Sequence, residues 1–370
     1  MKKIILLFVV LANSVLFADD KKDSSVYFRG VNLTVDSATL KNGLTMPNAL
    51  IFNNLVGGST NFSIPATNLF KGQGIEMGTN MRHNGLLGTD IGISFATLFA
   101  DSNFRTDYSS SSTRIGFGPT AMVSSNESIA MREYTSNRLQ TANIKIAENI
   151  YLFHDSGNRF LEGLALRLGG EIYGNEVKTK TPYSFNSSNA TLNGMNISTV
   201  GINGSSVSQL TYNEAYLNAV VGLGYNLKIA EGHNISFGYE YLKSVANSGN
   251  YVDKTRSLTA LTTNILIPGN SKVKGKIDSE LEGNRISVGY RFDVSENVSF
   301  GISYSHTEAT HKVVDSKIKG AGNISTLFSE GLSGNINLIP LILGSQPGFG
   351  PFPENKDIRR QIGINIVYKF

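Results

Sequence analysis

Three polar residues at positions 154 to 156 are the closest match in the sequence to a hydrolytic site. His154, Asp155 and Ser156 place a histidine two residues from a serine. Residues two apart on a strand face the same side, so an imidazole held by a third polar group could activate the hydroxyl. The stretch from Asp155 to Asn158, however, reads as a short connection between two strands. We therefore expect a polar turn here, and we do not expect an enzyme.

Metal and cofactor chemistry has little support in the sequence. His306 and His311 lie five residues apart on one expected strand, so they face opposite sides, which argues against a shared metal site. The chain has no cysteine, which excludes disulfides and thiolate ligands. It also has no Walker loop and no dinucleotide fingerprint. We expect no metal, no cofactor and, because 33 basic residues nearly balance 29 acidic ones, no nucleic acid.

Alternation of apolar and polar residues is the strongest pattern in the chain. From Ile362 to Phe370 every second residue is apolar, and most residues between are polar or small. The two sets face opposite sides of a strand. An apolar face suits lipid, and a polar or small face suits the lumen of a membrane barrel. The same alternation recurs at 164–169, 217–227, 235–241, 285–292 and 298–305.

This pattern predicts an all-β protein, a transmembrane antiparallel up-and-down β-barrel. A soluble β-sandwich also alternates, but several of these runs reach the roughly 9–11 residues that a spanning strand needs. We expect about twelve strands, within a range of ten to fourteen, because 112–123 and 127–136 could form a hairpin and 257–267 could add a pair. The other expected strands lie near 25–35, 74–83, 89–100, 138–154, 160–178, 210–228, 234–250, 279–293, 297–314 and 356–370.

Connections of two lengths set the expected orientation. Short connections occur at Asp155 to Asn158, Ala230 to His233 and Ser295 to Asn297. Outer-membrane barrels have short periplasmic turns and long outer loops. We therefore place the short turns and the C-terminus in the periplasm. The expected extracellular loops cover about 37–73, 180–208, 251–278 and 316–355.

The first 18 residues read as a secretory signal peptide. Lys2 and Lys3 precede an apolar run that ends at Phe17, and Ala18 precedes a charged stretch. The run is too short for a spanning helix, which needs about 20 residues. We expect cleavage after Ala18, which leaves residues 19–370 as one barrel in the outer membrane of a Gram-negative cell.

Charged residues on the polar faces are candidates for the lining of a pore. A barrel of twelve to fourteen strands lies between filled small barrels and open porins, and selectivity would follow its lining charges. An open lumen would then prefer anions mildly; alternatively, these charges pair across the lumen and only solvate it. The candidate lining residues are Lys145, Arg167, Glu171, Glu240, Arg285, Arg291, Arg359 and Lys369.

Two resemblances are carried by the last strands. The closing Ile364 to Phe370 resembles the C-terminal strand of bacterial outer-membrane proteins, which implies that Tyr368 and Phe370 belong to a signal read by the barrel-assembly machinery. Residues 285–292 and 299–306 resemble late strands of the fatty-acid transporter family of hydrophobic-compound channels. The N-terminal Asn-Pro-Ala of that family is not matched, because the order here is Pro47-Asn48-Ala49.

One expected outer loop is unusually apolar. Such patches mark a binding surface or an interface, so this loop could capture hydrophobic solutes; alternatively, it packs on the other loops, which have similar apolar stretches near the N-terminus. Its candidate contact residues are Leu338, Ile339, Leu341, Ile342, Phe349 and Phe352.

Two functions follow from these features. The first is porin-like transport, the passive passage of small solutes, with hydrophobic compounds included. The alternative is a surface-exposed antigen or adhesin presented at the cell surface on a barrel. A lumen with small residues and unpaired charges favours transport. A tightly filled lumen favours the alternative, in which the barrel is only a mount that anchors functional outer loops. The expected partners are outer-membrane lipid, lipopolysaccharide or its equivalent, the barrel-assembly machinery and small solutes.

Overall fold

The computed structural model describes residues 24–39, 69–100, 104–110, 113–116, 122–125, 128–187, 190–192, 195–196, 202–262, 265–322, 346–347 and 354–370. The expected signal peptide and the apolar loop candidates between Leu338 and Phe352 lie outside these ranges. No helix in the described ranges is long and apolar enough to cross a membrane.

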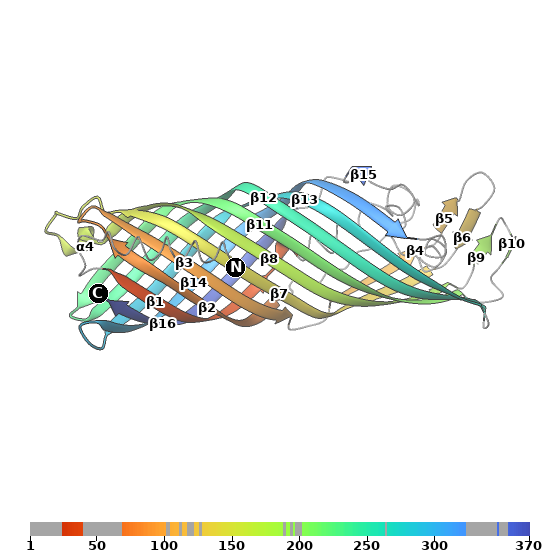
Figure 1. Ribbon diagram of the computed structural model, residues 1–370, viewed down its shortest axis with the longest axis horizontal. Helices are drawn as coiled ribbons and strands as arrows, with labels where there is room; N and C mark the ends of the chain where they lie inside the picture. Colours follow the sequence, from red (N-terminus) through yellow and green to blue (C-terminus); the bar gives the residue numbers. More distant parts are fainter. Residues whose placement is uncertain are drawn as a thin grey trace.

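Ten antiparallel strands close into a single barrel (Figure 1). They pair in chain order, and β16 closes the ring between β14 and β1. The strands are β1 (Ser25–Asp36), β2 (Leu69–Arg82), β3 (Leu87–Ala100), β7 (Ser128–Ile150), β8 (Leu164–Ser187), β11 (Ile202–Ala230), β12 (His233–Thr262), β13 (Ile265–Asp293), β14 (Val298–Gly322) and β16 (Asn355–Lys369).

The expected number of about twelve strands was therefore too high. Residues 127–136 do not form a separate strand of the ring, because Ser128 begins β7 and the strand continues to Ile150. Residues 257–262 and 265–267 likewise lengthen β12 and β13. Period-2 alternation marks an extended segment but cannot tell a new strand from the continuation of an old one.

The remaining elements are short. Strand β4 (Phe104–Ser110) pairs with β7, and β15 (Gln346–Pro347) pairs with β14. A separate small sheet contains β5 (Thr113–Gly116), β6 (Met122–Ser125), β9 (Ala190–Leu192) and β10 (Met195–Asn196). The one-turn helix α4 (Arg159–Glu162) precedes β8 and is capped by the side chain of Asn158.

The short turns and the C-terminus lie together at one end of the barrel (Figure 1). Strands β11 and β12 join at Gly232, whose φ of 71° suits a residue without a side chain. Strands β2 and β3 join through Asn84, whose side chain accepts hydrogen bonds from the backbone of Leu86 and Leu87. The short connections predicted at 230–233 and 295–297 are confirmed, whereas the one predicted at 155–158 is longer, because β7 ends at Ile150 and β8 begins only at Leu164, with α4 between them.

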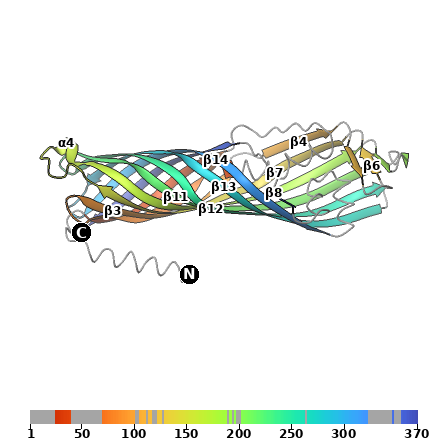
Figure 2. The same cartoon turned by 90° about the horizontal axis from the view of Figure 1, so that it is seen from above.

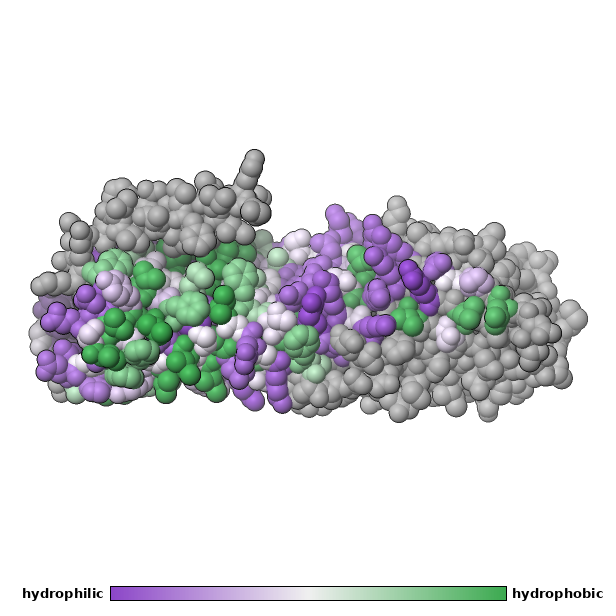
Figure 3. Space-filling model, turned by 60° about the horizontal axis from the view of Figure 1, so that its bottom comes forward, coloured by the Kyte–Doolittle hydropathy of each residue, from purple (hydrophilic) through white to green (hydrophobic). Residues whose placement is uncertain are grey.

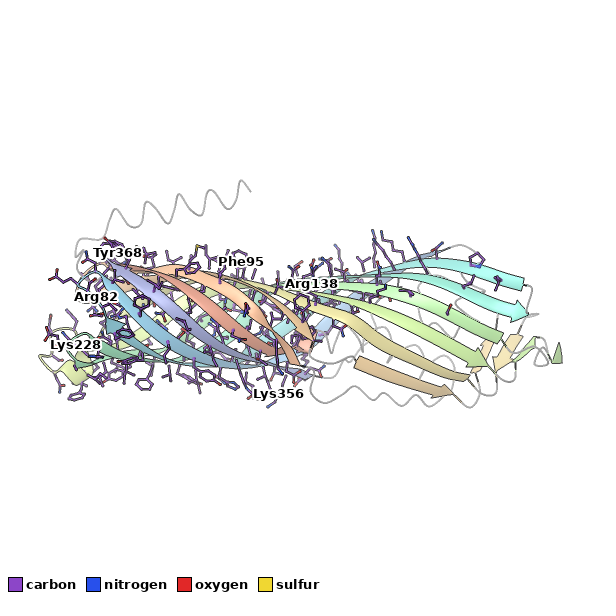
Figure 4. All side chains as sticks on the ribbon, turned by 90° about the horizontal axis from the view of Figure 1, so that it is seen from below. Arg82, Phe95, Arg138, Lys228, Lys356 and Tyr368 are labelled. Carbon is purple, nitrogen blue, oxygen red and sulfur yellow. The ribbon has the colours of Figure 1, made fainter. Side chains whose placement is uncertain are left out.

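A ring of exposed apolar side chains surrounds this half of the barrel. Ile364 is 67% exposed, Ile302 59% and Ile286 53%, although all three lie within strands. Figure 3 shows this apolar surface giving way to a hydrophilic one further along the barrel. In Figure 4 the apolar band, with Phe95 at its surface, lies between Arg82 and Lys228 at the short-turn end and Arg138 and Lys356 on the other side.

Six strands continue well beyond this apolar band. Strands β7, β8 and β11 to β14 have 23 to 30 residues, whereas β1, β2, β3 and β16 have 12 to 15. The six continue past the ends of the other four (Figure 2); we call this part the extension. Residues 251–278 were expected to form a loop, but the described residues 251–262 and 265–278 belong to β12 and β13, which pair from Tyr251↔Gly275 to Thr262↔Ile265.

Candidate functional site

Ion pairs cross the lumen inside the apolar band. Arg167 Nη2 lies 2.6 Å from Asp90 Oδ2, and its Nη1 lies 3.1 Å from Glu240 Oε1. Arg285 bridges Glu240 at 3.1 Å and Glu171 at 2.7 Å. Lys145 also pairs with Glu240. Because β8 and β13 are separated by two strands of the ring, the Arg285–Glu171 pair joins parts of the wall that are not adjacent.

Glu240 is the centre of this network. Its side chain is 3% exposed and contacts three cations, from β7, β8 and β13. A buried carboxylate is stable only when it is paired, because its desolvation costs several kcal/mol. Within this network three cations and three carboxylates therefore neutralise one another, which fits the second of the two sequence interpretations.

A second group of paired residues lines the wall formed by β1, β2 and β16. Glu76 accepts hydrogen bonds from Tyr27 at 3.0 Å, Arg29 at 3.1 Å and Gln361 at 3.0 Å. Arg29 and Glu76 are opposite each other in the strand register, so this pair stays on one wall.

A cavity of about 630 Å³ surrounds these groups and extends to the short-turn end; Glu76, Glu240 and Arg285 are part of its wall. Its wall includes Arg291 and Asn226 near the turns and Leu33 and Tyr173 at the inner limit. Asn218 also lines it; the residue is only 2% exposed, and its Oδ1 has no hydrogen-bond partner in the described structure. The cavity therefore has a polar wall that could hold water or a small polar molecule.

An apolar layer fills the lumen beyond the cavity. The side chains of Val35, Phe70, Leu98, Leu139 and Val177 are fully buried. They come from five strands and form one cluster with side chains from β11 to β14. Close-packed side chains of this kind leave no room for water, so the cavity does not continue past this layer. The other members of the cluster are Leu33, Leu210, Tyr212, Tyr251, Ile277 and Val313.

Glu214 and His311 form a buried ion pair next to the apolar layer and outside the apolar band. Glu214 Oε1 lies 3.0 Å from His311 Nε2 and accepts hydrogen bonds from Tyr212 and Ser279, both at 2.7 Å. Burial alone would raise the pKa of Glu214, but the His311 charge and these hydrogen bonds hold it at about 2. Burial would lower the pKa of His311, and the charge of Glu214 outweighs it and raises that pKa.

The chain turns into the lumen directly after β1. Ser37, Ala38 and Thr39 are 2%, 0% and 1% exposed. Thr39 donates a hydrogen bond to Glu214 Oε2 at 2.9 Å, and the backbone N–H of Ala38 donates to Asp357 Oδ2 at 3.3 Å. The expected loop 37–73 therefore begins inside the barrel, held by carboxylates on β11 and β16.

The candidate pore-lining residues all face the interior or its short-turn end. Lys145, Arg167, Glu171, Glu240 and Arg285 meet in the network around Glu240. Arg359 lies further from the short-turn end than this network. Its Nε is 2.6 Å from Asp357, and its guanidinium lies 4.0 Å from the ring centre of Tyr173. Arg291 lines the cavity, and Lys369 pairs with Asp293 at 2.7 Å beside the turn.

The two residues assigned to barrel assembly lie at the seam of the ring. Tyr368 points outward and is 52% exposed, opposite Val26 and Val298 in the register. The backbone N–H of Phe370 donates to the carbonyl of Ser24 at 3.1 Å. The last strand therefore closes the ring.

The histidines of the hydrolytic and metal hypotheses are placed as the sequence predicted. His154 lies in a turn, where Nε2 is 2.9 Å from Asp155 and Nδ1 is 3.2 Å from the carbonyl of Tyr151. The hydroxyl of Ser156 bonds to the backbone of Asn158 instead. His306 is opposite the outward Ile286, whereas His311 is buried inside. Within the described residues, no group of three acidic or histidine side chains could hold a metal ion.

Sequence reasoning missed Asp90, Glu214 and His311 as partners in the lumen. Strand parity does contain a signal for Glu214, because Leu217 and Val221 face outward and even-numbered positions of that strand therefore face inward. Which inward side chains meet across a barrel depends on strand number and shear, which parity does not give.

Comparison with known proteins gives only distant similarities. No protein-family model and no curated protein matches the sequence. Among solved structures, the outer membrane protease OmpT from Escherichia coli has 9% identity and a TM-score of 0.38, over 94% of this chain and 96% of that one. A Pseudomonas aeruginosa FadL homologue has 9% identity and a TM-score of 0.20, over 94% and 91%. The Pseudomonas putida toluene transporter TodX has 8% identity and a TM-score of 0.23, over 94% and 90%. Similarities of this size assign no activity to this chain.

Proposed function

We propose that this protein is an outer-membrane β-barrel that acts as a mount, holding its extension outside the cell as a binding surface. The observation that carries the proposal is the contrast between the two halves. Six strands stay paired far beyond the apolar band, whereas the lumen within and above the band is crossed by ion pairs and filled by the apolar layer. Of the two functions considered from the sequence, this favours the surface-exposed one.

The membrane assignment is supported by the apolar ring. Exposed isoleucines and aromatic residues around a whole barrel would be an aggregation liability in water. In lipid they stabilise the protein, and a closed barrel leaves no unpaired strand edge in the hydrocarbon. Strand β11 carries outward apolar residues from Leu217 to Leu227, which matches the roughly 9–11 residues of a tilted spanning strand.

The orientation follows from the two ends of the barrel. Short turns face the periplasm in outer-membrane barrels and longer segments face outward, which would place the extension outside the cell. On this assignment lipid and lipopolysaccharide would contact the apolar ring, and the barrel-assembly machinery would read the strand that ends at Tyr368 and Phe370.

Cysteine accessibility in cells tests this orientation directly, because the chain has no cysteine of its own. Leu266→Cys places a thiol in the extension, where the native side chain is 59% exposed. Ile229→Cys is the matched control at the short-turn end, where the native side chain is 46% exposed. A membrane-impermeant maleimide should label Leu266→Cys on intact cells and Ile229→Cys only after the outer membrane is permeabilised. The reverse order, or no labelling of intact cells, would contradict the proposal.

A gated channel is the second candidate, because a cavity of about 630 Å³ with the unpartnered Asn218 already occupies the short-turn half. Passage of a solute would require the segment from Ser37 to Thr39 and the apolar layer to move aside. Conductance that is absent in the wild type and appears in Thr39→Val, which breaks the bond to Glu214, would support this candidate. Absence of conductance in both the wild type and Thr39→Val would support the proposal that the barrel acts as a mount.

A further inference from the structure

A group of basic side chains gathers on the outer face of the extension. Buried Gly275 and Ile277 on β13 point to the inside, so the alternate residues point outward. We call the exposed group on β12, β13 and β14 the basic face; it consists of Lys254, Arg256, Lys272, Lys274, Lys276 and Lys317.

Like charges lie directly opposite each other on this face. Lys272 is the register partner of Lys254, and Lys276 is the partner of Lys317. Like charges at directly opposite positions destabilise a sheet. None of the six side chains has an ion-pair partner within the described structure. The nearest outward acids, Asp278 and Asp315, lie at one border of the face and are themselves opposite each other.

On these strands and the neighbouring β16, exposed charges closer to the apolar band are paired. Lys243 lies 3.3 Å from Glu282, Lys312 lies 3.4 Å from Glu354, and Lys356 pairs with Glu308. Exposed lysines on these strands therefore have acidic partners in one place and lack them in the other. The difference indicates that the basic face meets negative charge from outside the chain.

Protection of a sheet edge does not account for these lysines. Edge strands often carry lysine because it prevents pairing with another chain. Strand β13, however, is paired on both sides at these positions, with β12 and with β14, from Ser271 onward. Lys272, Lys274 and Lys276 therefore lie in the interior of the sheet.

We infer that the basic face binds an anionic polysaccharide; this inference rests on the proposed function, which places the extension outside the cell. Lysines at alternate positions of a strand are about 6.8 Å apart and adjacent strands about 4.8 Å, so the face offers a grid of cations to a linear polyanion. Exposed Gln209 and Asn250 flank it and can bond to sugar hydroxyls. The flanking outward side chains on β11 and β12, including Thr211 and Val252, provide no aromatic ring on which a nucleic-acid base could stack.

Binding of heparin to the detergent-solubilised full-length protein tests the inference. The triple variant Lys272→Gln, Lys274→Gln, Lys276→Gln removes three cations from the centre of the face. The control variant Lys243→Gln, Lys312→Gln, Lys356→Gln removes three exposed lysines that already have acidic partners. Neutral dextran and a single-stranded DNA oligonucleotide serve as comparison ligands.

We expect heparin to bind, dextran to fail, and the central triple variant to weaken binding at least tenfold while the control changes it less than twofold. Because binding to a polyanion releases counterions, the central variant should also have a shallower salt dependence. Equal loss in both variants, no binding by folded protein, or DNA binding as tight as heparin would overturn the inference. Heparin binding by the solubilised protein does not depend on its orientation in cells, so the two proposals can fail separately. If the maleimide labels as expected but heparin does not bind, only this inference is wrong. If heparin binds but the labelling order is reversed, only the proposed function is wrong.

Discussion

His311 on β14 and Glu214 on β11 form an ion pair across the interior of the barrel, with Nε2 3.0 Å from Oε1. Two strands of the ring, β12 and β13, separate the two residues along the wall. The pair also holds the segment that enters the lumen, since Thr39 donates to the other oxygen of Glu214. The interior of this barrel is thus tied together at the level where the extension begins.

Removal of the histidine charge should destabilise the barrel strongly. His311→Gln leaves Glu214 buried without its cation, and loss of one partner of a buried pair costs about 3–5 kcal/mol. Urea unfolding in lipid vesicles measures the change. His306→Gln is the matched control, because His306 faces outward on the same strand, and it should change stability by less than about 0.5 kcal/mol. Equal effects of the two variants would mean that the pair contributes no net stability.

The contribution of this pair should depend on pH with a maximum at mildly acidic values. The pKa of Glu214 lies at about 2, below its ordinary 4.5, so its contribution is present above pH 4.5 and disappears as the pH falls through 2. The pKa of His311 is raised above 6.5, so its contribution is complete below pH 6.5 and disappears as the pH rises through the folded value. The free-energy difference between the wild type and the double variant Glu214→Gln, His311→Gln should be largest between pH 4.5 and 6.5. A difference that stays constant from pH 3 to pH 9 would refute this assignment.

Neutralisation of Glu240 should also destabilise the protein. Glu240→Gln leaves Lys145, Arg167 and Arg285 with one acidic partner fewer inside the apolar band, at a cost of about 3–5 kcal/mol. Glu282→Gln is the control: it removes an exposed partner of Lys243, and because solvent screens such a pair it should change stability far less than Glu240→Gln. Addition of Lys145→Met to Glu240→Gln should recover part of the loss, because one unpaired cation is removed. No recovery would place Lys145 outside the network.

A lysine on the outer surface should have an effect that depends on its height along the barrel. Ile364→Lys places a charge within the apolar band and should cost about 2–4 kcal/mol in a bilayer. Val314→Lys replaces a side chain that is 58% exposed in the extension and should cost less than about 0.5 kcal/mol. Unfolding in vesicles compares the two. Similar costs would show that Ile364 does not face lipid.

Much of the wall could be predicted from the sequence, because parity along a strand fixes the face of each side chain. Ile364 and Ile366 were expected to point outward and do so, and Arg167 and Glu240 were expected to point inward and do so. The extension could not be predicted in the same way. Residues such as Lys272 and Ser257 continue strands beyond the apolar band. These parts of the strands have few apolar residues, and a sequence of low hydrophobicity resembles a loop.

The filling of the lumen was also beyond sequence reasoning. Val35, Phe70 and Leu139 come from three distant segments, and each alone reads as one apolar residue of an alternating strand. Their contact arises only from closure of the ten-stranded ring, whose small diameter brings opposite walls within reach of side chains. A strand number of twelve would have left more room between them.

Single-channel recording of the refolded wild-type protein in a planar bilayer tests the central claim most directly. Circular dichroism and resistance to unfolding would first establish that the barrel is folded. The account predicts no stable conductance steps in a salt gradient, because ion pairs around Glu240 cross the lumen and the apolar layer closes it. Stable open steps with a defined ion selectivity would contradict a closed mount and would make this protein a channel.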